Sequence, residues 1–425
     1  MPEEIKYVIL VGDGMADYPV EGLKGRTPLM VARTPHMDWM AKCGEVGLVR
    51  TIPDGFNPGS EIANLSIFGY DPIHYYTGRG PLEAASLGVK LHSEDIAFRC
   101  NLVTLKILEN KMFMDDFAAG HIADDEARAI LSDLDREIGT SDIRFYPGVS
   151  YRHLMVMKDG ASKFSNLEKL ELTPPHDILG KEITAFLPKV DEASALENSK
   201  KGGVEQILRL MTESQRILQD HPVNLARKTK GLRLANSIWL WGQGRSPQMV
   251  TLKERFGIEG YVISAVHLLK GIGILAGLEV LEVPGATGYF DTNYDGKAQY
   301  ALKGLKEKNF VYVHVEAPDE AGHMGELALK IEAIEAFDEK IVGTILKGMS
   351  VFKRYKVMVL PDHPTPLSVR THTADPVPYV IYSNEKGEKG GYAEAFDEVS
   401  ARQSGIFIER GFDLIERFLN PHCAV

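Results

Sequence analysis

The hydrophobic pattern at the two ends of the chain predicts a sheet with both faces buried. Residues 6–11, 309–315 and 356–360 are apolar at nearly every position. Parallel strands covered by helices on both sides have this pattern, whereas half-exposed strands alternate. Residues 297–306 have the pattern of a helix between two such strands. The ends of the chain therefore predict an α/β domain with a mostly parallel sheet flanked by helices.

The middle of the chain has a different pattern. Residues 95–115 alternate between polar and apolar positions around a short turn, which predicts a β-hairpin. Residues 203–219 carry apolar side chains near helical spacing, as amphipathic helices do. We therefore expect an inserted α+β domain over 80–260, between the two parts of the α/β domain, 1–79 and 261–425.

Composition excludes several classes of protein. Of 425 residues, 44% are hydrophobic and 25% are charged, as in soluble globular proteins. The formal net charge of -11 argues against a nucleic-acid partner. No run approaches 18 apolar residues and the first residues lack a signal-peptide pattern, so we expect a cytoplasmic protein without a membrane partner. Cys43, Cys100 and Cys423 are too few for a disulfide framework or a zinc cluster, and we expect reduced thiols.

Acidic and imidazole side chains follow three of the predicted strands. They are Asp13, Asp319, His323, Asp362, His363 and His372. Asp319 and His323 are four residues apart, so one helical turn places both on the same face. Any one of these residues is commonly structural, but open α/β sheets place their site chemistry at the carboxyl ends of strands. The recurrence of such residues after buried strands therefore indicates a site.

Ser60 lies where a Pro-Gly break meets an apolar, helix-compatible run. Two interpretations are open: a helix N-cap, which serine favours, or a nucleophile near a helix N-terminus that suits phosphate. Together with the six acids and histidines, Ser60 would make seven ligands for two divalent ions. Without a thiolate, manganese, zinc or magnesium fits best. Two such ions would clamp a phosphoryl group and activate the serine hydroxyl.

Several longer motifs occur in order along nearly the whole chain. They are G-D-G-M at 12–15, P-G-S-E-I-A-N-L-S-I-F-G-Y-D-P at 58–72, G-R-G-P-L-E-A-A at 78–85, P-G-A-T-G-Y at 284–289, H-V-E-A-P-D-E-A-G-H at 314–323, P-D-H at 361–363 and H-T-A-D-P-V-P at 372–378. Together they resemble the archaeal-type cofactor-independent phosphoglycerate mutase family of the alkaline phosphatase superfamily. The resemblance implies an alkaline-phosphatase-like core and interconversion of 2- and 3-phosphoglycerate through a phosphoserine, without 2,3-bisphosphoglycerate.

The resemblance also implies a role for each ligand. Ser60 would be the nucleophile. One metal would be held by Asp319, His323 and His372, and the other by Asp13, Ser60, Asp362 and His363. The family usually uses manganese, and zinc, magnesium or cobalt stays open. The oligomeric state is also open, a homo-oligomer included.

The inserted domain would hold a small phosphorylated hydroxy acid, because glycerate must stay bound while it turns. Guanidinium groups suit carboxylate and phosphate through bidentate pairing. The candidates for substrate binding are Arg79, Arg99, Arg152, Arg245, His121 and Lys270, of which we expect about half to be ordinary ion pairs. A general acid–base must also move the proton of the acceptor hydroxyl. Asp116 and Asp177 are equal candidates for it.

Other functions on the same scaffold stay open at this point. The metals would handle only phosphate, whereas the inserted domain would choose the acceptor. A homoserine kinase-like phosphotransferase of threonine synthesis is the first alternative, because this chain also resembles that bacterial branch. A phosphomonoesterase and a catalytically silent metal-binding protein are weaker ones.

Overall fold

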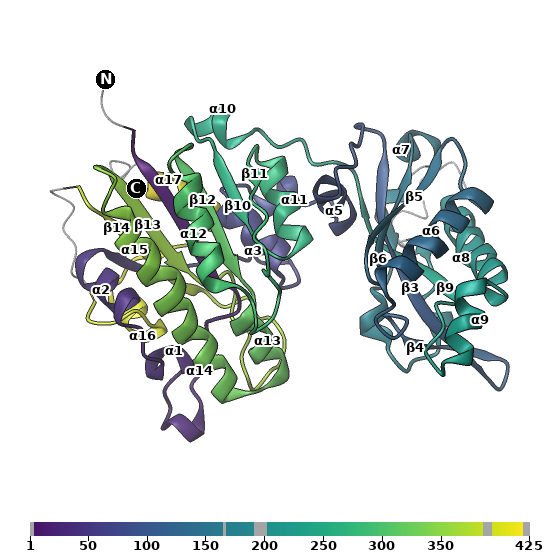
Figure 1. The fold of residues 1–425 in the computed structure, drawn as a ribbon, viewed down its shortest axis with the longest axis horizontal. Coiled ribbons are helices and arrows are strands. Elements are labelled where there is room, and N and C mark those ends of the chain that lie inside the picture. The colour runs from purple at the N-terminus through teal and green to yellow at the C-terminus, as the bar shows by residue number, and fades with distance from the viewer. Residues whose placement is uncertain (1–3, 165–166, 191–201, 386–392, 420–425) are drawn as a thin grey trace. The chain divides into compact units, whose positions relative to one another are not determined.

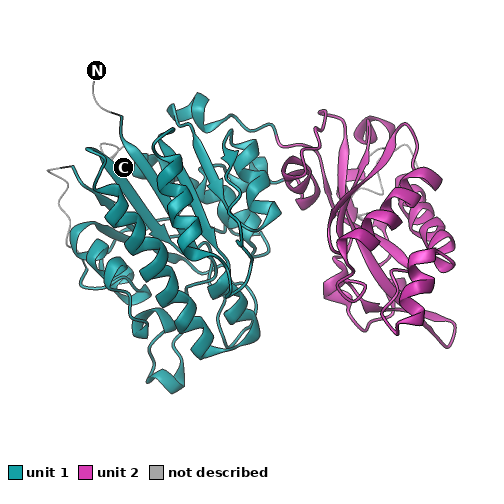
Figure 2. Ribbon diagram, viewed as in Figure 1, with its two compact units in different colours: residues 1–76, 248–425 teal, residues 77–247 magenta. Residues whose placement is uncertain are grey.

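The computed structural model describes residues 4–164, 167–190, 202–385 and 393–419. The chain forms two compact units (Figure 2): unit 1 spans 1–76 and 248–425, and unit 2 spans 77–247. The predicted borders lay at 79/80 and 260/261. Residues 248–260 belong to unit 1, where the Tyr70 hydroxyl donates to the Val250 carbonyl at 2.7 Å. Residues 77–79 belong to unit 2, where the Thr77 hydroxyl donates to the Arg245 carbonyl at 2.5 Å.

Unit 1 is built on a sheet whose eight described strands run in the order β11-β10-β12-β1-β13-β14-β2-β15 (Figure 1). The strands are β1 (Lys6–Gly12), β2 (Glu45–Val49), β10 (Gly260–Ile263), β11 (Glu279–Val280), β12 (Phe310–Val315), β13 (Tyr355–Leu360), β14 (Val377–Ser383) and β15 (Phe407–Ile408). Central β1 is parallel to both β12 and β13, whereas β14 is antiparallel to β13 and β2. The predicted α/β class with a mostly parallel sheet is confirmed.

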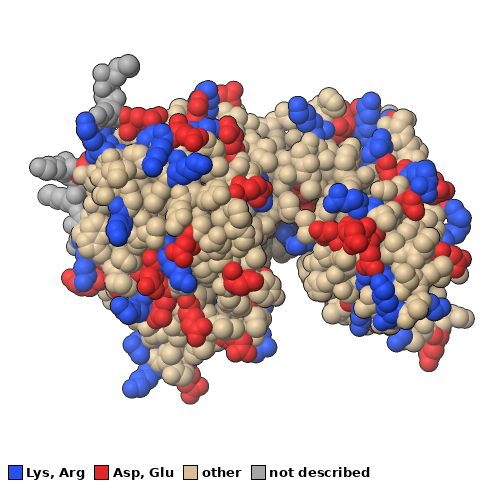
Figure 3. All heavy atoms as spheres, in the orientation of Figure 1, with Lys and Arg blue, Asp and Glu red and all other residues tan. Residues whose placement is uncertain are grey.

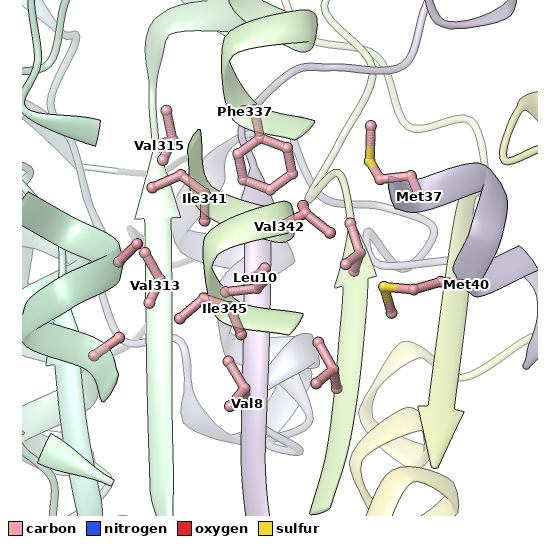
Figure 4. Packing of buried hydrophobic residues seen from close by; sticks show 14 of the residues in the cluster. Val8, Leu10, Met37, Met40, Val313, Val315, Phe337, Ile341, Val342 and Ile345 are labelled. Atoms are coloured by element: carbon pink, nitrogen blue, oxygen red, sulfur yellow. The ribbon is translucent and has the colours of Figure 1, made fainter. Parts of the chain in front are cut away.

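Helices cover both faces of this sheet. They are α1 (Pro28–Val31), α2 (Pro35–Cys43), α3 (Ser60–Ile67), α4 (Pro72–Tyr75), α10 (Leu252–Phe256), α11 (His267–Leu275), α12 (Tyr294–Gly304), α13 (Ala317–Met324), α14 (Leu327–Ala336), α15 (Thr344–Met349), α16 (Glu398–Gln403) and α17 (Leu414–Leu419). On one face, Tyr7 of β1 meets Phe418 of α17, with ring centroids 5.6 Å apart. On the other face, Leu10 of β1 lies in a cluster with side chains of α2 and α15 (Figure 4). Burial on both faces explains the uninterrupted apolar runs.

A π-helical segment, η6 (Phe337–Gly343), joins α14 to α15 above the sheet. Phe337, Ile341 and Val342 of this segment pack into the core (Figure 4). Asp338 of the same segment accepts the backbone N–H groups of His36 and Met37 at 3.2 and 2.7 Å. The segment therefore satisfies donors in the first turn of α2 while its apolar side covers β1.

Unit 2 has an antiparallel sheet with helices. Its strands are β3 (Ile96–Leu108), β4 (Lys111–Asp116), β5 (Ile143–Val149), β6 (Arg152–Met157) and β9 (Ser237–Gly244), with a separate pair β7 (Leu170–Glu171) and β8 (Lys189–Val190). Its helices are α5 (Arg79–Ser86), α6 (Asp124–Glu137), α7 (Gly160–Lys163), α8 (Gly203–Gln219) and α9 (Pro222–Thr229). The predicted hairpin is β3–β4, and its turn residues Glu109 and Asn110 both have positive φ. The inserted α+β unit is confirmed.

Cys43 and Cys100 are free thiols, whereas Cys423 lies outside the described residues. In the part of the chain that the structure describes, no helix is long and apolar enough to cross a membrane. On the visible face of each unit, acidic and basic side chains are interspersed (Figure 3).

Candidate active site

Ser60 is the first residue of α3, and Gly59 before it occupies the N-cap position. Ser60 therefore lies one residue inside the cap position. Its Oγ lies instead 3.1 Å from Nε2 of His363, a residue 303 positions further along the chain. The interpretation of Ser60 as an N-cap is therefore wrong, and the hydroxyl belongs to the cluster of acids and histidines.

The cluster forms at the carboxyl ends of three neighbouring strands of unit 1. Asp13 follows β1, Asp319 lies in α13 directly after β12, and Asp362 and His363 follow β13. Because β1 is parallel to both other strands, the three strand ends meet at one edge of the sheet. His372 reaches the same edge from the segment between β13 and β14.

Two sets of potential metal ligands lie at this edge, each with its ligand atoms within 4.8 Å of one another. One set is Asp319, His363 and His372, and the other is Asp13, Asp362 and His363. His323 adjoins the first set, because its Nε2 lies 2.9 Å from Nε2 of His372 and 3.2 Å from Oδ2 of Asp319. All seven predicted ligands therefore come together. His363 stands between the two sets, whereas the resemblance assigned it to one metal.

The buried acids of the cluster repel one another. Burial raises the pKa of Asp13 well above its usual value, and Asp362 and Asp319 raise it further. Burial also opposes ionisation of Asp319, but hydrogen bonds with His323 and His372 hold its pKa well below the usual value. Buried carboxylates and imidazoles without a thiolate fit a hard or borderline divalent cation, which would offset the repulsion.

His314 of β12 belongs to the same site and was not predicted. Its Nε2 lies 3.2 Å from Asp13, and its Nδ1 lies 3.2 Å from Glu316. Glu316 in turn lies 3.2 Å from Nζ of buried Lys297. These groups form a buried chain of alternating charge behind Asp13. The signal was present in the sequence, since His314 is a polar residue inside an otherwise apolar buried strand.

Asn64 and Thr365 were also missed. The Asn64 side-chain amide donates to the Ser60 carbonyl at 2.8 Å and to Asp362 at 2.9 Å, while its oxygen accepts the Tyr312 hydroxyl. The Thr365 hydroxyl donates to Asp319. Asn64 stands one helical turn after Ser60, and that spacing was the available signal. These neutral side chains orient the ionised ones.

Three of the arginine candidates lie together in unit 2. The guanidinium groups of Arg99 and Arg79 lie 4.5 and 5.6 Å from the ring centroid of Trp241. Burial lowers the pKa of Arg99 to about 10, Glu83 opposes this, and the positive charges of Arg79 and Arg152 lower it further. Arg152 lies in β6, which pairs with the strand of Arg99, β3, so the three arginines lie in one part of unit 2.

Arg152 connects this cluster with another candidate. Its guanidinium lies 5.4 Å from the ring centroid of Tyr151, and that ring meets His121 at 5.7 Å. His121 is exposed and has a φ of +50°. His121 is thus connected to the arginine cluster through the Tyr151 ring.

Arg245 and Lys270 have acidic partners of their own. Arg245 Nε lies 2.8 Å from Glu168, and its Nη1 lies 3.4 Å from Glu94. Lys270 belongs to α11 in unit 1, with Nζ 2.8 Å from both carboxylate oxygens of Glu282. Neither one joins the arginines that contact Trp241.

The two acid–base candidates differ in their surroundings. Asp116 accepts the backbone N–H of Ala118 at 2.7 Å and lies 3.2 Å from Nε of Arg233. Asp177 is exposed, 3.6 Å from Nε2 of His176. The His176 ring lies 5.4 Å from that of Trp241, so this imidazole adjoins the arginine cluster. It was missed although it precedes Asp177 directly.

Comparison with known proteins agrees with this geometry. A family model described as 2,3-bisphosphoglycerate-independent phosphoglycerate mutase matches residues 41–224. A probable enzyme of that name from Geobacter sulfurreducens is 50% identical over 98% of this chain and 100% of its own length. The chain belongs to this family. Another relative with that name, from Methanosarcina acetivorans, is 51% identical over 97% of this chain and 98% of its own.

Solved structures resemble the fold as well. The PH0037 protein from Pyrococcus horikoshii has a TM-score of 0.79 and 29% identity, over 98% of this chain and 97% of its own. The cofactor-independent phosphoglycerate mutase from Thermoplasma acidophilum has a TM-score of 0.65 and 26% identity, over 98% of this chain and 99% of its own. The similarity to this mutase family therefore extends over both units.

Proposed function

We propose that this chain is an isomerase that interconverts 2- and 3-phosphoglycerate through a phosphoserine at Ser60, without 2,3-bisphosphoglycerate. The observation that carries the proposal is the 3.1 Å separation between Ser60 Oγ and His363 Nε2, inside a cluster with two sets of metal ligands. Membership of the mutase family supports the choice of substrate.

The cluster fits two divalent ions, manganese first, with zinc, magnesium or cobalt as alternatives. Their ligands would be Asp13, Ser60, Asp319, His323, Asp362, His363 and His372. When bound, such ions stabilise phosphoryl oxygens as Lewis acids and promote ionisation of a serine hydroxyl.

The proposed reaction has two phosphoryl-transfer steps, in which residues of the chain have separate roles. Ser60 Oγ loses its proton and forms a bond to phosphorus while the bond from phosphorus to the ester oxygen of the substrate breaks, and that oxygen takes up a proton. The second hydroxyl of glycerate then loses its proton and forms a bond to the phosphorus of the phosphoserine. The bond from phosphorus to Ser60 Oγ breaks in the same step, and Oγ takes up a proton again. Asp116 and Asp177 are candidates for moving these protons, and Arg79, Arg99 and Arg152 for holding the anionic groups of glycerate.

The test is conversion of 3-phosphoglycerate to 2-phosphoglycerate by the manganese-loaded protein, with no added bisphosphoglycerate. We expect Ser60→Ala to lower kcat by about 10³-fold or more, because it removes the nucleophile. Ser66→Ala is the matched control, since Ser66 is buried on the same helix and should tolerate the change. Wild-type activity that survives in S60A would contradict the proposal.

Two further arms of the assay address the alternatives. Homoserine and a phosphate donor are supplied in one, and free phosphate is measured in the other. Phosphohomoserine as the main product would replace the mutase with a kinase-like transferase. Accumulation of free phosphate from 3-phosphoglycerate, without 2-phosphoglycerate, would indicate a phosphomonoesterase.

A further inference from the structure

Trp241 of β9 is the shared contact of two guanidinium groups in unit 2. Its ring centroid lies 4.5 Å from the guanidinium carbon of Arg99 and 5.6 Å from that of Arg79. Trp241 is only 4% exposed, and its indole N–H donates to Oδ1 of Asn101 at 3.1 Å. The ring is therefore fixed, and both cations lie against one rigid aromatic side chain.

A β-bulge brings the arginine stems to this ring. Trp241 pairs with Arg99 across β9 and β3, and the register shifts immediately beyond that pair. Gly242 lies in the bulge with a φ of +61°. A Cβ built at Gly242 would lie 3.5 Å from the Arg79 side chain and 3.6 Å from that of Arg99. Bulges re-aim side chains, and here the bulge brings both arginines over one glycine.

The Gly-Arg-Gly sequence explains how Arg79 reaches the bulge. A Cβ at Gly78 would lie 2.1 Å from the carbonyl oxygen of Gln243, and one at Gly80 would lie 2.5 Å from that of Ala97. No side chain fits at either distance, so only glycine allows the start of α5 to lie against the backbone of β9 and β3. Arg79, between the two glycines, is thereby placed at the bulge.

The guanidinium groups around Trp241 carry like charges. Glu83 lies one turn after Arg79 on α5, and its carboxylate is 3.2 Å from Nε of Arg99. The guanidinium groups of Arg79 and Arg99 contact the same ring, and the positive charges of Arg79 and Arg152 disfavour the charge on Arg99. An oxyanion that accepts hydrogen bonds from the guanidinium groups would relieve this repulsion.

We propose that Trp241 is a positioning residue that holds Arg79 and Arg99 as a fixed pair for an oxyanion of the substrate. The identity of the substrate rests on the proposed function, whereas the oxyanion site rests on unit 2 alone. Guanidinium groups that are ordered before binding lose less side-chain entropy when the ligand arrives. Trp241 therefore controls affinity for the oxyanion and leaves the transfer step nearly unchanged.

Calorimetry on the full chain, stripped of metal with chelator, tests the site independently of catalysis. The ligands are 3-phosphoglycerate, D-glycerate and inorganic phosphate, and the variants are Trp241→Leu and Trp241→Phe. We expect W241L to raise the Kd of 3-phosphoglycerate roughly tenfold and W241F about twofold to threefold, since phenylalanine keeps an aromatic face. If W241L binds D-glycerate more weakly than wild type does, the group bound at this site is the carboxylate. If W241L binds inorganic phosphate more weakly, the bound group is the phosphate.

Trp239→Phe is the matched control. Trp239 stands two residues earlier on β9, is 1% exposed and donates its N–H to the Thr173 carbonyl. We expect the Kd of W239F for 3-phosphoglycerate to stay within about twofold of wild type, because this substitution changes the core and leaves Trp241 in place. If circular dichroism shows that W241L does not fold, the proposal is tested by comparing the Kd values of W241F and W239F.

The kinetic readout separates positioning from general damage. In the manganese-loaded enzyme, W241L is expected to raise KM roughly tenfold with kcat within about twofold. The inference is overturned if metal-free wild type binds none of the three ligands, if W241 and W239 variants bind alike, or if kcat falls at constant KM. A further outcome is that W241L binds the oxyanion more weakly while the wild type lacks mutase activity. This outcome would support the oxyanion site and contradict the proposed function.

Discussion

His153 of β6 is buried in unit 2, and burial lowers the pKa of its imidazole to about 3. Its Nδ1 accepts the backbone N–H of Gly148 at 3.0 Å, so the ring is neutral with its proton on Nε2. In the unfolded chain the same ring titrates near 6.5. As the pH falls from about 6.5 towards 3, protons therefore bind the unfolded chain in preference, and the free energy of unfolding declines.

We predict that His153→Asn removes part of this pH dependence, because asparagine can accept the Gly148 N–H without titrating. Between pH 7 and pH 4, the wild type should lose about 2–3 kcal/mol more unfolding free energy than the variant. Urea unfolding followed by the fluorescence of unit 2 tryptophans at both pH values measures the difference. Parallel pH profiles for the two proteins would show that His153 does not contribute.

At the scale of elements, α5 and the end of β9 pack backbone to backbone. A Cβ at Gly244 would lie 1.9 Å from the carbonyl oxygen of Thr77 and 3.2 Å from the nitrogen of Gly78. Neither atom is the end of a flexible side chain, so a larger residue must push α5 away from the strand. The Gly-Arg-Gly motif and the β9 bulge therefore pack against each other, although they are far apart in the sequence.

We predict that Gly244→Ala destabilises unit 2 by about 1–3 kcal/mol, as overpacking does. The same variant is expected to weaken binding of 3-phosphoglycerate, because it displaces Arg79. Gly288→Ala is the control, since a Cβ there meets nothing within 4 Å. Denaturant unfolding monitored by circular dichroism gives the free energies, and equal values for the two variants would refute the packing argument.

At the scale of the whole molecule, the predicted metal ligands all lie in unit 1, and the arginine cluster lies in unit 2. Asp362 and Asp319 oppose the ionisation of buried Asp13, and a bound cation would offset this effect. A ligand that binds only the folded state adds about 2.7 kcal/mol at a concentration 100 times its Kd. A metal ion held by these residues would therefore stabilise unit 1 and not unit 2.

We predict that chelation lowers the Tm of unit 1 by several degrees and that manganese restores it, while the transition of unit 2 stays in place. Differential scanning calorimetry resolves the two transitions, and Asp319→Asn should abolish the manganese-dependent shift. A manganese effect on unit 2 alone, or an undiminished shift in D319N, would place the metal elsewhere.

Local patterns in the sequence predicted the strands, the insertion and the seven candidate ligands that lie together at one edge of the sheet. Strands covered on both faces must be apolar throughout, and parallel strands end at the same edge, so residues such as Asp13 and Asp362 could be predicted to meet. Ser60 could be placed at a helix start for the same local reason.

Only the tertiary structure decided how these residues share their partners. His363 lies between two ligand sets, His314 supports Asp13, and Trp241 contacts two arginines from different elements. Arg245 and Lys270 looked equivalent to the other cations, but they pair with Glu168 and Glu282, whereas Arg79 and Arg99 contact Trp241. Charge pairing depends on distances between side chains far apart in the chain, and hydrophobic periodicity carries no information about those distances.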